Sequence, residues 1–179
     1  MSLDWVKLEL DVATFDPTPF APAIEAVRAD GIEMSTLAAL GNTEANQRRL
    51  YELNAECSAD IPNRGRFHTW SEYRRMRLNV DSFDPRGVVI ARRGDAWIGM
   101  ASISVHPAQS VLFTEMTGVV RSERRRGLAL AMKVRNIAEF SALWDITNLR
   151  TVHHPENAGI IALNRQLGYV DAHWPYPAS

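Results

Sequence analysis

A change of hydrophobic period at Gly127 constrains this chain more than any other feature of its sequence. Before this glycine, apolar and β-branched residues fill segments that are separated by short turns rich in glycine, proline and serine. These segments predict an antiparallel meander of strands over residues 86–92, 97–105 and 111–120. After Gly127, apolar side chains recur at helical spacing to about Trp144, which predicts an amphipathic helix. A strand must therefore pass through a short polar loop directly into a helix.

The rest of the chain alternates between strand and helix patterns. Strands are expected over residues 5–12, 32–37, 149–153 and 169–173, and helices up to Ala29 and over 43–59, 69–78 and 157–167. Elements mixed in this order, with a meander at the centre, predict the α+β class. We expect a single mixed sheet, mostly antiparallel and flanked by helices.

Bulk composition excludes several classes of function. The 179 residues suit one domain, or one domain with an additional arm, and a net charge of −1 argues against nucleic-acid and membrane partners. The single cysteine, Cys57, cannot form an intramolecular disulfide, and we interpret it as a buried, inert thiol. No apolar run approaches the roughly 20 residues of a membrane span, and the first residues lack the pattern of a signal peptide. We therefore expect a cytoplasmic protein.

The loop that precedes the central helix carries the strongest chemical signal. Residues 117–129 run from the end of a strand through Arg124-Arg125-Arg126 to Gly127 and Ala129. A helix N-terminus presents unpaired N–H groups and partial positive charge, and small residues there allow a pyrophosphate to approach. The alternative is a solvated basic loop, which is the more frequent explanation of a basic loop with one glycine taken alone.

Two motifs in sequence order resemble those of the Gcn5-related N-acetyltransferases (GNAT family). Arg124–Ala129 resembles the family's acetyl-CoA motif, in which arginine or glutamine precedes a glycine and a second small residue. Asn157–Tyr169 is similar to the second motif, a helix that begins near an asparagine and ends in Leu-Gly-Tyr. The close resemblance covers residues 111–169, and a looser match in element order extends back to Ile32. It implies the acyl-CoA N-acyltransferase (GNAT) fold, with acetyl-CoA as cosubstrate.

The resemblance also implies where acetyl-CoA binds. The backbone of the fourth family strand would pair with the pantetheine arm, the Val119 N–H would polarise the thioester carbonyl, and the loop would hold the pyrophosphate. Asn157 would contact the cofactor, although it is also placed to cap its helix. The implied cofactor-binding residues are Val119, Val120, Arg121, Arg124, Arg125, Arg126, Gly127, Leu128, Ala129, Asn157 and Asn164.

The candidate catalytic residues match the family pattern less completely than the cofactor motif does. Glu115 lies on the strand where family members often carry a catalytic carboxylate, and it is our candidate general base. By the strand period of two, it should share a face with Phe113, Thr117 and Val119. Alternatively, it points to solvent or pairs with an arginine. Many family members place a tyrosine, as proton donor to the thiolate, where this chain has Asn164, and an amide cannot replace that donor.

The acceptor is not identified by the sequence. His68, Trp70 and Tyr73 follow the helix beside which the family builds its acceptor pocket, so they are candidates for substrate contacts; ordinary packing is the alternative. A small amine, an antibiotic, an amino acid, a thiol-precursor amine and a peptide N-terminus all remain possible acceptors. His153 and His154 should point to opposite faces of a strand, so we expect no metal site there. A catalytically silent acyl-CoA-binding sensor or scaffold is the second hypothesis for the whole chain.

The N-terminal arm supplies an element that the C-terminal end lacks. Family members finish with a seventh strand, whereas this sequence ends soon after Tyr169, with Pro175 and Pro177 opposing a further strand. We expect residues 1–30 to form an arm on a domain of residues 31–179, with Trp5–Val12 filling the seventh-strand position. The strand could join its own sheet or that of a partner in a swapped homodimer. Alternatively, the arm is the tail of a preceding domain in a tandem protein.

Overall fold

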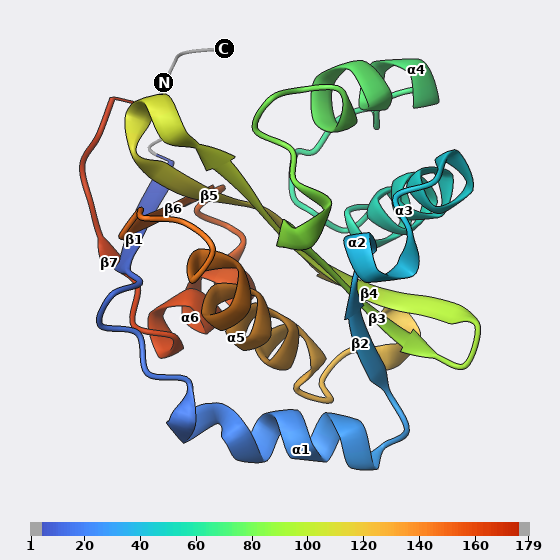
Figure 1. The fold of residues 1–179 in the computed structure, drawn as a ribbon, viewed down its shortest axis with the longest axis horizontal. Helices are drawn as coiled ribbons and strands as arrows, with labels where there is room; N and C mark the ends of the chain where they lie inside the picture. The colour runs from blue at the N-terminus through green and yellow to red at the C-terminus, as the bar shows by residue number, and fades with distance from the viewer. Residues whose placement is uncertain (1–4, 176–179) are drawn as a thin grey trace.

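The computed structural model describes residues 5–175, which form one seven-stranded sheet with helices on both faces (Figure 1). The strands follow the order β2-β3-β4-β5-β6-β1-β7 across the sheet. Their bounds are β1 (Val6–Asp11), β2 (Glu33–Thr36), β3 (Val88–Arg93), β4 (Ala96–His106), β5 (Val111–Val119), β6 (Asn148–His153) and β7 (Val170–Asp171). All neighbouring pairs are antiparallel except β5 and β6. The predicted α+β class and single mixed sheet are confirmed.

The helices divide between the two faces of the sheet (Figure 1). One face packs against α1 (Ala21–Ala29), α5 (Leu128–Ser141) and α6 (Ala158–Gln166), and the other against α2 (Leu37–Leu40), α3 (Glu44–Cys57) and α4 (Trp70–Tyr73). The expected helix over residues 69–78 is a single α-turn followed by a π-helical turn, Arg74–Leu78. A capping box between Thr69 and Glu72 fixes its start. No helix within residues 5–175 is long and apolar enough to cross a membrane.

The N-terminal strand β1 lies inside the chain's own sheet. It pairs antiparallel with β6 along its whole length and with β7 at Leu8 and Glu9. Leu8 is 0% exposed and Leu10 is 5% exposed, so β1 contributes to the core beside α6. The strand thus lies between β6 and β7 in this sheet, and its equivalence to the family's seventh strand stays a prediction. The division into an arm and a domain at residue 30, and any exchange with a partner, stay predictions.

The parallel pair β5 and β6 diverges after a short contact. Val111, Leu112 and Phe113 pair with Asn148–Arg150, and no later residue of either strand belongs to this ladder. Beyond that point β5 remains bonded to β4, whereas β6 remains bonded to β1. The two strands therefore separate and leave one edge of β5 without a neighbouring strand.

A β-bulge at Glu115 changes which face of the sheet each residue of β5 occupies. Ser102 pairs with Met116 and Ile103 pairs with Thr114, which leaves Glu115 as the extra residue. Glu115 consequently points toward the α3 and α4 side, where it contacts Ser104. The expectation that Glu115 shares a face with Thr117 and Val119 is therefore wrong, since the extra residue interrupts the period of two. Phe113 does share a face with Glu115. It pairs with Ser104, whose Oγ contacts the Glu115 carboxylate.

Close packing between α3 and β5 depends on a glycine. A Cβ at Gly118 would lie 2.5 Å from the Cys57 Cβ and 2.8 Å from the Met116 Cε. Both contacts are shorter than carbon atoms tolerate, so α3 lies as near to the sheet as this position permits. Burial by this packing raises the pKa of the Cys57 thiol to about 12.

We expect Gly118→Ala to lower the free energy of unfolding by about 1–3 kcal/mol, because the added methyl group overpacks the α3 interface. Urea denaturation measures this loss. The matched control is Gly159→Ala in α6, where an added Cβ would meet nothing within 4 Å. The control should keep or slightly raise stability. Equal midpoints for wild type and Gly118→Ala would contradict the packing argument.

Candidate active site

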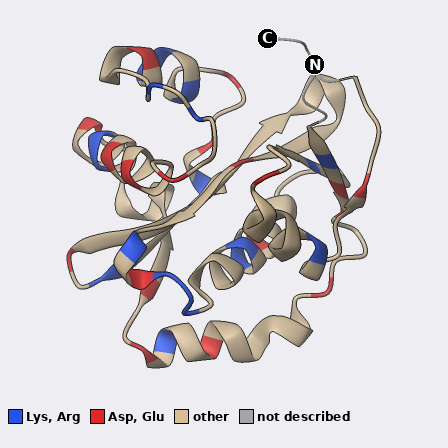
Figure 2. Ribbon diagram, turned by 180° about the vertical axis from the view of Figure 1, so that it is seen from behind, with Lys and Arg blue, Asp and Glu red and all other residues tan. Residues whose placement is uncertain are grey.

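A groove of about 810 Å³ lies where β5 and β6 diverge. Its walls come from the second half of β5, the loop into α5, the first turn of α5, one side of α6 and the segment that follows α3. The groove thus contains the loop and the helix that the two sequence motifs singled out. Figure 2 shows that basic residues gather in the loop that leads into α5.

The free edge of β5 presents backbone groups to this groove. The Val120 N–H bonds the Ile98 carbonyl on β4 at 2.9 Å. Because successive N–H groups of a strand point to opposite edges, the Val119 N–H is directed away from β4 and toward the groove. The Val119 carbonyl points the same way, since it accepts a hydrogen bond from Arg124 Nε at 3.0 Å. Val120 itself is buried, with 7% exposure, and does not line the groove.

The loop between β5 and α5 has the backbone geometry of an anion site. Gly127 adopts a φ of +74° at the N-cap of α5, and no side chain caps this helix end. The first helical bond runs from the Ala131 N–H to the Gly127 carbonyl, so the N–H groups of the preceding turn are left for another acceptor. Leu128 and Ala129 in that turn both line the groove. An oxyanion would find aligned donors and the positive end of the helix dipole there.

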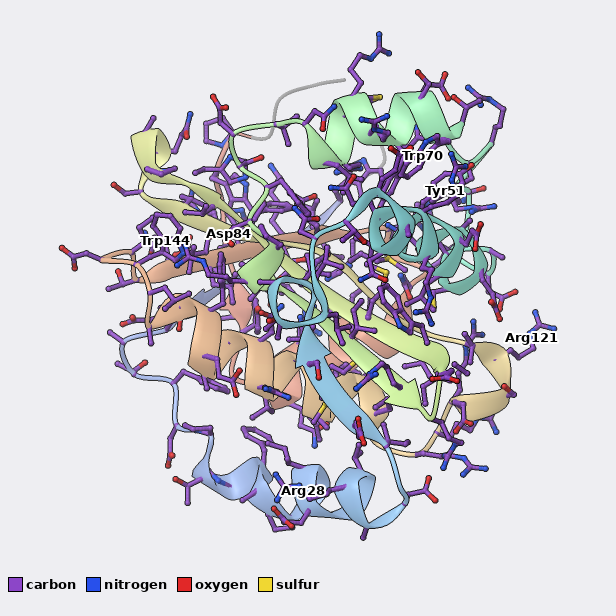
Figure 3. All side chains as sticks on the ribbon, turned by 45° about the vertical axis from the view of Figure 1, so that its right-hand side comes forward. Arg28, Tyr51, Trp70, Asp84, Arg121 and Trp144 are labelled. Atoms are coloured by element: carbon purple, nitrogen blue, oxygen red, sulfur yellow. The ribbon has the colours of Figure 1, made fainter. Side chains whose placement is uncertain are left out.

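The arginines around the loop do not all face the groove. Arg124 and Arg125 line it, whereas Arg121 and Arg126 do not. Arg121 projects outward with its side chain 80% exposed (Figure 3), and Arg126 pairs with Asp30 at 3.2 Å. The implied phosphate role therefore does not fit the side chains of Arg121 and Arg126 in this arrangement.

An acidic residue that the motifs did not predict holds two of these arginines. Asp60 follows α3, lines the groove and bonds Arg121 Nη2 at 2.6 Å and Arg124 Nη1 at 2.7 Å. The hydrogen bonds from Arg124 and Arg121 keep the pKa of Asp60 below its ordinary value. Asp60 therefore fixes the Arg124 side chain at the mouth of the groove. Nothing in the sequence near Asp60 signals this long-range contact.

The two asparagines of α6 are placed differently. Asn157 lines the groove and makes no capping bond to its helix, so the capping alternative is not what the structure shows. Asn164 is 0% exposed and does not line the groove. Its Nδ2 lies 2.7 Å from His153 Nε2. The expected contact of Asn164 with a cofactor does not fit this buried position.

His153 is a groove residue that sequence reasoning treated only as half of an unsuitable metal pair. Burial, together with the nearby Lys133, lowers the pKa of its imidazole to about 4, so His153 is neutral at pH 7. Its Nε2 also lies 3.1 Å from Thr151 Oγ1. His154 instead contacts Asn63 Nδ2 at 3.2 Å, so the two histidines engage different groups. Within residues 5–175 no set of three or more His, Cys, Asp or Glu side chains is arranged to hold a metal.

A second cavity, of about 360 Å³, opens on the α3 and α4 side of β5. His68 and Tyr73, two of the candidate substrate residues, line it, and their contact with a substrate stays a prediction. Trp70 does not line it and instead packs against Tyr51 at 5.5 Å between ring centres (Figure 3). Trp70 therefore follows its packing alternative.

The two cavities meet at the bulge of β5. Four residues line both of them: Ile61, Arg64, Glu115 and Met116. Glu115 Oε1 accepts a hydrogen bond from Ser104 Oγ at 2.6 Å, and Oε2 accepts one from Arg77 Nη1 at 2.9 Å. The alternative of an arginine-paired glutamate is thus present, yet the carboxylate still lies at the junction with its side chain 30% exposed.

A polar layer lies beneath the floor of the groove. Lys133 of α5 is 2% exposed and its Nζ lies 5.4 Å from the centre of the Tyr169 ring. Thr114 and Thr117 line both the groove and the small space beside Lys133. Among the described residues no carboxylate lies within 4 Å of the Lys133 ammonium, because no ion pair includes it. Burial lowers the pKa of Lys133 to about 7.

Lys133→Met should stabilise the fold at neutral pH. Between pH 7 and 10.5 the unfolded chain binds a proton on this lysine that the folded chain lacks, so this group makes stability rise with pH. Each pKa unit of this shift corresponds to about 1.4 kcal/mol. The gain from Lys133→Met should be largest at pH 7 and below and shrink toward pH 10, as thermal denaturation will show. Lys7→Met, at the only other lysine, is the control. A gain that is independent of pH would refute the interpretation.

No protein-family model and no curated protein matches the chain by sequence. Solved structures do match its fold. The GCN5-related N-acetyltransferase from Sphaerobacter thermophilus has a TM-score of 0.65 and 19% identity, and the match covers 94% of this chain and 48% of that one. A tandem GNAT protein from the clavulanic acid biosynthesis pathway has a TM-score of 0.64 and 20% identity, over 96% of this chain and 51% of that one.

A third match comes from a smaller protein, Arabidopsis thaliana Naa50 in complex with the bisubstrate analogue CoA-Ac-MVNAL. Its TM-score is 0.56 with 13% identity, and the match covers 77% of this chain and 82% of that one. This chain therefore spans about half the length of the two longer proteins and most of the shorter one. At these identities the likeness is one of architecture. The chain has the fold of the GCN5-related N-acetyltransferases.

Proposed function

We propose that the protein transfers an acetyl group from acetyl-CoA to an amine by direct attack in a ternary complex. One observation carries the proposal: two cavities on opposite sides of β5 meet at Glu115, beside the strand edge that exposes the Val119 N–H. The groove suits a long anionic thioester and the second cavity suits an acceptor. A cytoplasmic location is part of the same proposal and rests on the single, buried cysteine.

The groove residues fit acetyl-CoA, which supplies an acetyl group activated as a thioester. The uncapped N-terminus of α5 and the open space at Gly127 suit the pyrophosphate, and Arg124 and Arg125 add positive charge. Asn157 also lines the groove. The unpaired edge of β5 offers the backbone groups that an extended amide-containing arm requires. No metal is needed for this chemistry.

Groups of the protein itself polarise the thioester carbonyl and accept the proton of the amine in this proposal. The Val119 N–H is placed to donate a hydrogen bond to a carbonyl oxygen on which negative charge develops. Glu115 is placed to hold the acceptor amine and to take its proton, directly or through water. The amine forms a bond to the acetyl carbon while the C–S bond breaks. Asn164 is buried and carries no transferable proton, so the thiolate takes its proton from another group or from water.

Adding a negative charge at the first turn of α5 tests whether this part of the groove binds the pyrophosphate. Ala129→Glu places a carboxylate in the first turn of α5, where the helix dipole favours it, so the fold should persist. Acetyl-CoA affinity should fall about tenfold or more, because the new charge opposes the pyrophosphate. The neutral control Ala129→Gln should lose much less. Calorimetric titration with CoA measures both, and equal affinities for the two variants would contradict this site.

The role of Glu115 has its own test. Glu115→Gln should lower kcat at neutral pH by about 100-fold, the usual order for loss of a general base, while CoA affinity stays nearly unchanged. Release of the CoA thiol in the presence of an amine panel measures turnover. Glu139→Gln is the matched control, since Glu139 is also paired with an arginine but lies on the outer side of α5. Unchanged turnover in Glu115→Gln would remove it as the base.

A catalytically silent acyl-CoA-binding sensor or scaffold is the second candidate. The observation in its favour is Asn164, which stands where many relatives carry the proton-donating tyrosine and which is sealed inside the fold. Such a module would bind acetyl-CoA tightly without releasing CoA for any acceptor. Turnover with even one amine class would exclude it.

A further inference from the structure

We propose that the acceptor is an apolar α-amino acid whose carboxylate is free and is bound by Arg64. The inference rests on the proposed acetyl transfer and names the substrate class for the cavity of about 360 Å³ beside α3 and α4. Three features carry it: an arginine without an acidic partner among the described residues, its place with Glu115 at the border of the two cavities, and a group of apolar side chains in the otherwise mixed lining of this cavity.

Arg64 differs from the other arginines of this cavity. Arg66 forms a two-pronged pair with Glu72, at 3.0 and 3.2 Å, and Arg77 pairs with Glu115 at 2.9 Å. Over the described range, 5–175, Arg64 has no carboxylate within ion-pairing distance, because no salt bridge includes it. A ligand anion is therefore the missing partner that the geometry points to.

The guanidinium of Arg64 is held in place yet keeps donors free. Its Nη1 donates to Ser58 Oγ at 2.8 Å and to the Ala55 carbonyl at 3.4 Å, and the group lies over the Phe67 ring at 5.3 Å. These contacts use only Nη1, whereas the guanidinium fork also carries Nε and Nη2. A fixed fork with unused donors suits bidentate binding of a carboxylate.

The positions of Arg64 and Glu115 indicate an α-amino acid. Both residues line the groove as well as the cavity, so both lie where the two spaces meet. An amine and a carboxylate are then required at the same end of the acceptor, which is the arrangement around the Cα of an amino acid. The arginines of the cavity also disfavour polyamines, because like charges repel.

The body of the cavity suits an apolar side chain. Its lining away from the junction includes Leu50, Leu78, Phe83, Val88 and Met100. Apolar surface of this kind favours burial of hydrocarbon, and its volume lies at the small end of ligand sites. An aliphatic or aromatic amino acid combines that side chain with the two charged groups at the junction.

The reaction balances with groups already named. The α-ammonium loses one proton to become a nucleophile, its nitrogen bonds to the acetyl carbon, and the C–S bond breaks. A second proton leaves the nitrogen and one proton is taken up by the thiolate. The products are an N-acetyl amino acid, the CoA thiol and one released proton, and no oxidant or metal takes part.

The deciding experiment compares acids with amides. Release of the CoA thiol would be measured with wild-type protein, acetyl-CoA, and L-leucine, L-methionine or L-phenylalanine, each beside its α-carboxamide and with spermidine as a cationic probe. We expect kcat/KM for the acids to exceed that for the amides about 10- to 100-fold, the range of a charge-assisted hydrogen-bonded pair. Amides or spermidine preferred over the acids would overturn the inference.

A variant of Arg64 distinguishes loss of carboxylate binding from loss of the folded structure. Arg64→Gln should remove the preference for the acid, mainly through a higher KM, while turnover of the amide persists and shows that the protein is folded. Arg165→Gln, at an exposed arginine paired with Asp171, should keep the preference. An acid preference that survives Arg64→Gln would refute the assignment of Arg64.

Failure of the N-acetyltransferase proposal can be distinguished from failure of the amino-acid inference. If no amine is acetylated by protein that binds acetyl-CoA, the N-acetyltransferase proposal fails. Calorimetry with CoA-saturated protein then tests the cavity itself, using L-leucine and L-leucinamide. Binding of the acid without the amide would support the inferred ligand class, and equal or absent binding would overturn it.

Discussion

The short parallel contact between β5 and β6 is the constraint on which the rest of the structure depends. Only three residues of β5, ending at Phe113, pair with β6, and each strand then follows its other neighbour. A longer ladder would close the groove and consume the β5 backbone groups that now face it. A shorter one would release β6 from the sheet. The separation also frees the end of β5 to pass into the loop and α5, so the candidate anion site lies at one end of the same opening.

The bulge at Glu115 links this opening to the second cavity. An extra residue in β5 turns the carboxylate toward α3 and α4, while Thr114 and Thr117 keep to the α5 side. Because Glu115 then borders both spaces, one side chain can serve ligands that enter from opposite faces of the sheet. Arg77 and Ser104 hold the carboxylate there, which restricts it to the junction.

Local patterns in the sequence predicted the helix and strand structure around the candidate site. The strand, polar loop and helix around Gly127 follow from a change of period and a glycine, which the structure holds at positive φ, so the candidate anion site could be proposed from the sequence. The bulge could not, because an extra residue in a strand leaves no mark on a short mixed segment. Asn164 is buried in contact with His153, which lies 11 residues away in the sequence. The proposed role of Arg64 rests on the lack of a carboxylate near it among the described residues. Such long-range facts need coordinates.

The polar layer beneath the groove is the part of the fold that packing does not explain. Methionine would fill the space of Lys133 without desolvating an ammonium group, and the buried Thr117 Oγ1 and Asn164 Oδ1 have no hydrogen-bond partner among residues 5–175. Each of these features costs stability, yet all lie under the opening between β5 and β6. That opening is where the proposed reaction releases a thiolate and where Asn164 cannot supply the proton. Lys133, Thr117 and Asn164 therefore lie below the step for which the proposal names no protein proton donor, whereas other unpaired buried atoms, such as Arg92 Nε and Trp144 Nε1, lie away from the groove.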